Sequence, residues 1–282
     1  MSQLELFKYQ ALGNDYLLLD LPAPLDDVLT LLPRLCDRNL GLGSDGLLAF
    51  DPRAMTVRIF NPDRSEAQKS GNGLRIVAAH AVLEHGAGDR FELRTVDRSN
   101  QVRVLHRGGA EVVSEIDIGR PSFRAADLPA KFEGEPDNVS LDTPAGTVTA
   151  VLVSVGNPHC VVFGETVTKV RCVELGPYLE RHRAFPERTN VQLCEVLDRG
   201  RVHIEIWERG AGYTLASGTS ASAVAAACMR RGLVDDSVTV AMPGGELAVR
   251  RDGAGDLVQS GPARRVYRAA VELADFSPEA AS

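Results

Sequence analysis

The sequence predicts an α+β protein built from two pseudo-symmetric halves. The chain has 282 residues, enough for two medium-sized domains that each bury a core. Short alternating apolar runs typical of strands are interrupted by a few helical segments. A strand, a polar loop and a helix start follow one another in residues 59–73 and again, at the same internal spacing, in residues 206–220. The architecture is therefore predicted to be duplicated.

The first half is predicted to be α+β. It begins with an alternating strand pattern and has a helix near Leu25 to Cys36 and another after Gly73. The strands are predicted at residues 4–7, 16–19, 47–50, 102–105 and 116–118.

A segment rich in Pro, Gly and charged residues, from Arg120 to Val139, is the predicted crossover between the halves. The second half then repeats the plan, with helices near Val173–His182 and Ala221–Arg231. Its strands are predicted at residues 147–155, 160–163, 191–196, 202–207 and 238–241. We expect domains at residues 1–120 and 121–265, a last strand at residues 266–273 that returns to the first domain, and a disordered tail at residues 277–282.

Composition narrows the classes of ligand. A formal charge of −7 and a pI near 5.5, with no run of Lys or Arg, argue against nucleic acid and against a polybasic membrane contact. No signal peptide and no apolar run of membrane-spanning length are visible, so we expect a cytoplasmic protein. The five cysteines contain no CxxC pair, so neither a disulfide framework nor a metal site is expected. A small-molecule ligand fits best.

Each copy of the repeat places a serine before a run of small residues at a helix start. The runs are Ser70-Gly71-Asn72-Gly73 and Ser217-Gly218-Thr219-Ser220. The first backbone N–H groups of a helix and the positive end of its dipole attract an anion, and a carboxylate is the ligand we expect there. The alternative is that both serines simply cap their helices, since serine is a preferred N-cap residue.

Polar residues in the loops before these serines are also candidates for binding. Arg209 offers a planar fork for a second carboxylate, and Glu208 beside it could take an ammonium group. A surface ion pair is the alternative. A second, weaker repeat consists of the dipeptides Gly13-Asn14 and Gly156-Asn157, although Gly-Asn dipeptides mark turns generally. We expect His159 to be a packed, hydrogen-bonded histidine rather than a general base.

Five ordered motifs together resemble one known family, diaminopimelate epimerase. They are Leu12-Gly13-Asn14-Asp15, Phe60 to Glu66 with the run from Ser70 to Gly73, Gly156-Asn157-Pro158-His159-Cys160, Pro186-Glu187-Arg188-Thr189-Asn190 and Glu208-Arg209-Gly210-Ala211-Gly212. The resemblance covers nearly the whole chain. It implies two α+β halves, each a mixed sheet or open barrel around a central helix, with the active site in the cleft between them. It also implies a cofactor-independent enzyme that inverts an α-carbon with one acid and one base.

The resemblance also assigns roles to individual residues. It makes Ser70 and Ser217 the acid–base positions. Asn14 would line the pocket of the carboxylate next to the reacting carbon, and a second group would bind the distal amino-acid end of diaminopimelate. The backbone cradle for the reacting carboxylate would be Gly71, Asn72, Gly218 and Thr219. The distal end would be held by Asn61, Asn157, Asn190, Glu208 and Arg209.

The chain departs from the family at the two acid–base positions, where the family has cysteines. A thiol has a pKa near 8.5 that a helix N-terminus can lower, whereas an alcohol is a far weaker acid. The double replacement should therefore slow the usual reaction severely. Tyr213, where the family usually has glutamate, and Ser222, where it often has cysteine, favour natural divergence over deliberate mutation. Lys69 could activate Ser70, although an exposed surface lysine is the simpler interpretation.

The resulting expectation is a PLP-independent isomerase that interconverts LL- and meso-diaminopimelate, a lysine and cell-wall precursor. Its partner would be a small amino-acid substrate with two carboxylates, with no metal and no cofactor. The alternatives are an isomerase of another amino or dicarboxylic acid, and a non-catalytic or engineered inactive homologue that binds such a ligand. The oligomeric state stays open, with a homodimer among the candidates.

Overall fold

The computed structural model describes residues 3–67, 70–96, 98–132 and 137–277, and these divide into two compact units. Unit 1 comprises residues up to Ile116 together with Gly261 onwards, and unit 2 comprises Asp117–Ser260. The predicted tail beyond Ser277 and the predicted role of Lys69 lie outside the described residues.

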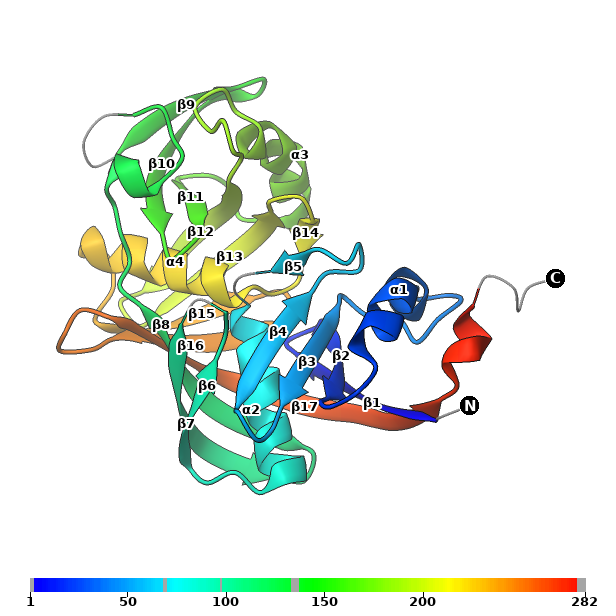
Figure 1. Ribbon diagram of the computed structural model, residues 1–282. Coiled ribbons are helices and arrows are strands. Elements are labelled where there is room, and N and C mark those ends of the chain that lie inside the picture. The colour runs from blue at the N-terminus through cyan, green and yellow to red at the C-terminus, as the bar shows by residue number, and fades with distance from the viewer. Residues whose placement is uncertain (1–2, 68–69, 97, 133–136, 278–282) are drawn as a thin grey trace. The chain divides into compact units, whose positions relative to one another are not determined.

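Unit 1 is a ring of strands around one helix. Its strands β17, β1, β2, β3, β4, β6, β7 and β8 are hydrogen-bonded in that order, and β8 returns to β17, so the ring is closed. Helix α2 lies within the ring (Figure 1). The elements are β1 (Leu4–Ala11), β2 (Asn14–Asp20), α1 (Leu25–Leu35), β3 (Leu47–Asp51), β4 (Thr56–Phe60), β5 (Glu66–Ala67), α2 (Gly71–His85), β6 (Arg90–Arg94), β7 (Ser99–Gly108), β8 (Glu111–Gly119), part of β17 (Leu257–Val271) and the 3₁₀ helix η2 (Leu273–Phe276).

The sequence of α2 explains its central position. Every residue from Gly71 to Val82 is buried, and most of them are small or aliphatic. A helix that is apolar on all sides has to be surrounded by protein. Strand β2 serves two cores because alternate side chains point to opposite faces: Leu18 packs in the α2 core, whereas Leu17 and Leu19 pack in the α1 core.

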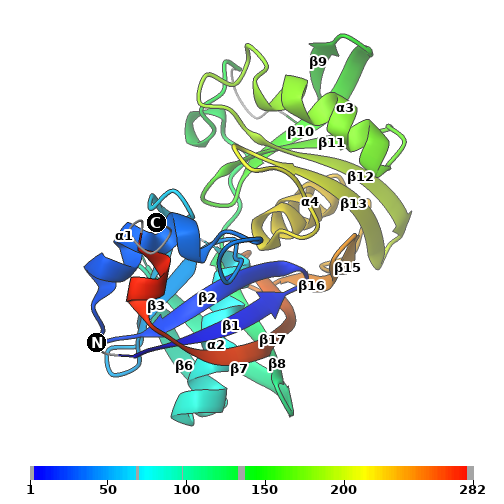
Figure 2. The same cartoon turned by 90° about the vertical axis from the view of Figure 1, so that its right-hand side faces the viewer.

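Unit 2 repeats the plan of unit 1. Its two longer helices lie on opposite sides of strands β11 and β12 (Figure 2). The elements are the 3₁₀ helix η1 (Ala125–Asp127), β9 (Val139–Thr143), β10 (Gly146–Ser154), β11 (Pro158–Phe163), α3 (Lys169–Glu180), β12 (Asn190–Asp198), β13 (Arg201–Glu208), β14 (Gly212–Thr214), α4 (Gly218–Arg230), β15 (Ser237–Met242), β16 (Gly245–Arg251) and the start of β17.

The strand pairing confirms the predicted duplication. In unit 1, β1 pairs antiparallel with β2, β2 parallel with β3, β3 antiparallel with β4, β4 parallel with β6, and β6 antiparallel with β7. In unit 2, β10, β11, β12, β13, β15 and β16 follow the same succession of directions. Helices α2 and α4 occupy equivalent places in this order. The α+β class is therefore correct.

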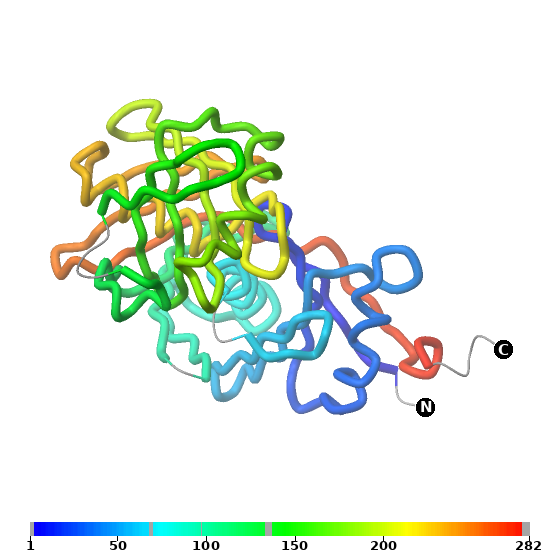
Figure 3. Tube along the Cα trace, turned by 90° about the horizontal axis from the view of Figure 1, so that it is seen from above, coloured from blue at the N-terminus to red at the C-terminus, as the bar shows by residue number. Residues whose placement is uncertain are grey.

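The predicted elements are found, with differences at their ends. Helices predicted to start near residues 173 and 221 begin at Lys169 and Gly218. The last strand, predicted at residues 266–273, is longer and begins at Leu257. It pairs antiparallel with β1, so strands from opposite ends of the sequence lie side by side in unit 1 (Figure 3). The prediction missed the short strands β5 and β14, and it also missed β6, β9 and β16, although polar and apolar residues alternate in β6 and β9.

Candidate functional site

Ser70 and Ser217 are the N-caps of α2 and α4, with nearly the same backbone geometry. Their φ and ψ angles are −145° and 113° for Ser70 and −145° and 124° for Ser217. The hydroxyl of Ser70 accepts the N–H of Gly73 at 2.9 Å, and that of Ser217 accepts the N–H of Ser220 at 3.3 Å. The helix-capping interpretation is thus realised in both units. Each hydroxyl still keeps its own proton, so capping and proton transfer are compatible.

Both helix starts share a second feature. The guanidinium of Arg75 donates to the carbonyl of Gly71 at 3.4 Å, and the hydroxyl of Ser222 donates to the carbonyl of Gly218 at 2.9 Å. These donors occupy the same position in their helices and fix the first turn in the same way. Neither first turn carries an acidic side chain, so the positive end of each dipole keeps its attraction for an anion.

In unit 1 the structure brings Asn14 and Asn72 together. The Asn72 amide donates to the Asn14 carbonyl oxygen at 3.1 Å, and the Asn14 amide donates to Asp45 at 2.7 Å. Arg75, which is fully buried, donates to the Asn72 carbonyl oxygen. Burial lowers the pKa of Arg75 to about 9, so the side chain remains positively charged at neutral pH. The buried cation of Arg75, within α2 itself, therefore orients the amide of Asn72.

Asn14 directly follows a hairpin turn, and Asn157, its counterpart in the second Gly-Asn dipeptide, lies within one. Leu12 and Gly13 have positive φ angles of 57° and 88° in the turn between β1 and β2, and Gly156 has a φ of 99° in the turn between β10 and β11. The interpretation of these Gly-Asn dipeptides as turn markers is therefore correct. Each turn also sets the position of its asparagine. Asn61 stays in its own loop, where its amide donates to the Ser65 hydroxyl at 2.9 Å.

In unit 2 Asn190 joins two of the predicted motifs. Its amide donates to the carbonyl of Pro158 at 2.9 Å, and its side-chain oxygen accepts the backbone N–H of Arg209 at 3.0 Å. The neighbouring Asn157 oxygen lies 2.9 Å from Nε2 of His159, which is buried. His159 is thus a packed, hydrogen-bonded histidine, as predicted.

Glu208 ends β13, and the turn after it, which carries Arg209, is held by a residue that the sequence did not reveal. Glu180, at the end of α3, is only 3% exposed. Its carboxylate accepts the backbone N–H of Gly210 at 3.0 Å and the indole N–H of Trp207 at 2.8 Å. The Arg209 guanidinium in turn donates to the carbonyl of Glu187 at 3.3 Å. Only the three-dimensional contact identifies Glu180, because nothing in the local pattern of α3 distinguishes it.

Tyr213, one of the departures from the family pattern, has a partner in its own unit. Its hydroxyl donates to Glu205 at 2.8 Å, and the ammonium of Lys169 lies 4.9 Å from the centre of its ring. Burial, and then the hydrogen bond and charge of Glu205, raise the pKa of Tyr213 well above its ordinary value. The phenol therefore remains a proton donor to Glu205 over the whole physiological range.

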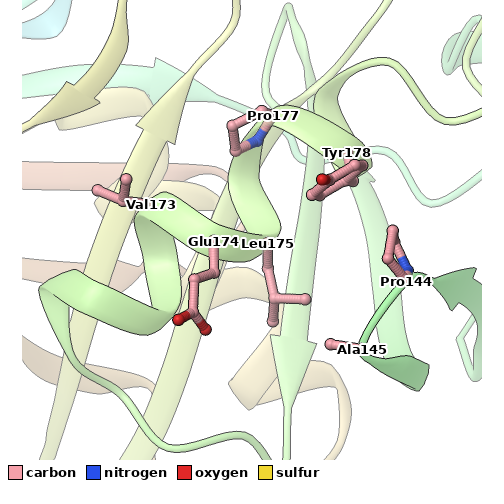
Figure 4. A pocket seen from close by; sticks show the side chains of 7 residues that line it. All are labelled: Pro144, Ala145, Val173, Glu174, Leu175, Pro177 and Tyr178. Atoms are coloured by element: carbon pink, nitrogen blue, oxygen red, sulfur yellow. The ribbon is translucent and has the colours of Figure 1, made fainter.

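An apolar hollow of about 580 Å³ lies apart from these residues, on unit 2. It is formed by one side of α3 and the turn between β9 and β10 (Figure 4). Val173 and Tyr178 are partly exposed there. No predicted site residue lines it, so we assign it no part in the reaction.

Comparison with known proteins decides the family. The sequence matches the diaminopimelate epimerase family over residues 6–124 and 151–266. The chain belongs to the diaminopimelate epimerase family. A diaminopimelate epimerase of Desulforudis audaxviator is 40% identical over 276 residues, which cover 94% of this chain and 98% of that protein. A protein named diaminopimelate epimerase 2, from a Nostoc species, is 40% identical over 259 residues that cover 88% of each chain.

Solved structures of low sequence identity share the fold. A hydroxyproline epimerase from Agrobacterium vitis superposes with a TM-score of 0.68 at 18% identity and covers 99% of this chain and 93% of its own. A phenazine biosynthesis protein of the PhzF family from Bacillus anthracis gives a TM-score of 0.69 at 14% identity, covering 96% and 100%. The protein is thus a member of an isomerase family with a two-domain α+β fold. None of the helices among the described residues has both the length and the apolar character needed to span a bilayer.

Proposed function

We propose that this chain is a PLP-independent amino-acid epimerase that acts on LL- and meso-diaminopimelate, with Ser70 and Ser217 at the acid–base positions. Relatives named diaminopimelate epimerase are 40% identical over most of the chain, which supports this substrate. The five residues that the resemblance assigns to the distal amino-acid end are all present: Asn61, Asn157, Asn190, Glu208 and Arg209.

The observation that carries the proposal is the equivalence of the two serine caps. Each unit offers one hydroxyl at the same place on an equivalent helix, with backbone φ equal and ψ within about ten degrees. Inversion at a carbon needs one group that removes a proton and another that returns it. Two equivalent groups from a duplicated plan meet that requirement.

The serines set the expected rate. At each cap the hydroxyl oxygen accepts a backbone N–H and lies at the positive end of a dipole, and both effects favour an alkoxide. An alcohol starts from a pKa far above that of a thiol, however, and general acid–base catalysis contributes roughly 10²–10⁴-fold. We therefore expect slow turnover that rises when cysteines replace the serines.

The test follows exchange of the substrate α-proton in D₂O by NMR. Diaminopimelate and a panel of amino and dicarboxylic acids are incubated with the native chain and with the Ser70→Cys/Ser217→Cys variant. The control is Thr168→Cys, because Thr168 caps α3 in the same way, with its hydroxyl accepting the N–H of Arg171, but lies outside the family's acid–base positions.

The proposal expects exchange with diaminopimelate in the native chain, faster exchange in the double-cysteine variant and no change in Thr168→Cys. Exchange with another amino or dicarboxylic acid, but not with diaminopimelate, would support the proposed type of reaction and show that the proposed substrate is wrong. Exchange only in the double-cysteine variant would show that the native chain with its two serines does not catalyse the reaction. Binding without exchange in any form would refute the acid–base assignment.

A further inference from the structure

Asp20, His80 and His85 form a cluster in unit 1 that the proposed reaction does not use. Asp20 ends β2, and the two histidines lie in the last part of α2. One ligand atom of each residue lies within 4.8 Å of the others. None of the three belongs to the motifs that identify the family.

The two imidazole rings converge on a single carboxylate. Nε2 of His80 lies 2.9 Å from one oxygen of Asp20, and Nε2 of His85 lies 3.0 Å from the other. The ring centres of the histidines are 5.2 Å apart. The His80 side chain is completely buried, whereas those of Asp20 and His85 are each 30% exposed. The cluster is therefore preorganised inside and accessible to solvent on one side.

The orientation of His80 is fixed from the other side of its ring. The hydroxyl of Tyr9 lies 3.1 Å from Nδ1, and the rings of Phe7 and Phe50 pack edge-on against the imidazole. With no ion, Nε2 can donate to Asp20 while Nδ1 accepts from Tyr9. When an ion binds, the Tyr9 oxygen can instead accept the proton of Nδ1, which leaves the lone pair of Nε2 for the ion. Histidines that ligate metals have this type of partner on their second nitrogen.

We propose that Asp20, His80 and His85 bind a borderline divalent cation, with Zn²⁺ as the reference ion. Two imidazoles and one carboxylate form a ligand set that Zn²⁺ accepts, with solvent in the fourth position. Around a tetrahedral zinc with bonds of about 2.0–2.1 Å, neighbouring ligand atoms are about 3.3 Å apart. The present distances of 2.9 and 3.0 Å run to different oxygens of Asp20, and the three ligand atoms lie within 4.8 Å of one another, so a bound ion would draw them closer together.

The bound ion would replace the two hydrogen bonds between Asp20 and the histidines and would tie β2 to the end of α2. An ion that binds only the folded protein raises the free energy of unfolding, and it does so more strongly as the free ion concentration rises above the dissociation constant. The expected ion class is narrow, because imidazole ligands suit zinc, nickel and copper, whereas magnesium prefers oxygen ligands and water.

The test uses the full chain, stripped with a chelator and titrated with Zn²⁺ by calorimetry and with Co²⁺ by absorption spectroscopy. We expect one Zn²⁺ per chain, a Co²⁺ spectrum of four-coordinate type, no binding of Mg²⁺, and a higher thermal midpoint with Zn²⁺. Replacing a ligand in His85→Gln should weaken Zn²⁺ at least ~10-fold, since even loss of an outer partner costs about 10–100-fold.

The matched control is His203→Gln. The His203 side chain is 32% exposed, close to the 30% of His85, and lies 3.9 Å from a carboxylate, that of Glu195 in unit 2. This variant should bind Zn²⁺ like the native chain. Asp20→Asn provides a second ligand variant, and circular dichroism checks that each variant is folded. Absence of Zn²⁺ binding, equal binding of Mg²⁺, or a folded His85→Gln variant with native affinity would overturn the site.

Discussion

Replacing Glu180 with Gln tests how the loop of Glu208 and Arg209 is held. The two oxygens of Glu180 accept separate donors, the N–H of Gly210 at 3.0 Å and the indole N–H of Trp207 at 2.8 Å. Glutamine has a single side-chain acceptor, so one of the two donors would face an amide group. Hydrogen bonds to charged groups contribute about 1.5–3 kcal/mol each, which gives an expected loss of about 2 kcal/mol.

The loss can be measured in two ways. At about 2–4 °C per kcal/mol for a unit of this size, the thermal midpoint should fall by about 4–8 °C. The denaturant midpoint should fall without a change in the dependence on denaturant. The two donors, Trp207 and Gly210, lie on either side of Arg209, so the loss of either bond should loosen Arg209 and weaken binding of the proposed substrate, diaminopimelate.

The control for this prediction is Glu174→Gln on the same helix. The Glu174 side chain is 58% exposed and its ion-pair distance to Arg171 is 3.5 Å, so its loss should cost well under 1 kcal/mol. Equal thermal midpoints for the Glu180→Gln and Glu174→Gln variants would show that Glu180 does not hold the loop.

Three further predictions concern packing, capping and pH. Gly176→Ala should destabilise the protein by about 1–3 kcal/mol, because its Cβ would lie 2.4 Å from Cγ of Trp207, while Gly88→Ala meets no atom within 4 Å and should leave the denaturant midpoint unchanged. Ser217→Ala should cost about 0.5–2 kcal/mol in a urea melt through loss of the N-cap; a midpoint equal to the native one would contradict the cap. Burial raises the pKa of Cys160 to about 12, so the unfolded chain releases this proton first as pH rises. The free energy of unfolding should then fall above pH ~8.5, and more steeply than in a Cys160→Ala variant; parallel pH profiles would count against it.

Local patterns predicted the duplication and both helix starts. The serine, glycine and small-residue runs at Ser70 and Ser217 lie at the N-termini of α2 and α4, because N-cap preference is a local property. The Gly-Asn turns were also visible for a local reason, since the left-handed backbone at Gly13 and Gly156 favours glycine.

Contacts between distant residues were not predictable in this way. Strands β12 and β13 separate Glu180 from Gly210 in the sequence, and α1, β3, β4 and β5 separate Asp20 from His80. The cysteine count gave no sign of a metal site, because the proposed ligands are histidines whose convergence with Asp20 depends on the fold. Arg75 resembled an ordinary helix residue until the ring of strands showed it to be fully buried.

The last strand has a consequence for the order in which the chain folds during synthesis. Strand β17 belongs to unit 2 up to Ser260 and to unit 1 from Gly261, where it pairs with β1. During synthesis, β1 therefore stays without its β17 partner until residues 264–271 have emerged, after the whole of unit 2. Pairing strands so far apart in the sequence carries a loop-closure cost and favours slow folding. Unit 1 should therefore be completed after unit 2, although β1 is synthesised before any strand of unit 2.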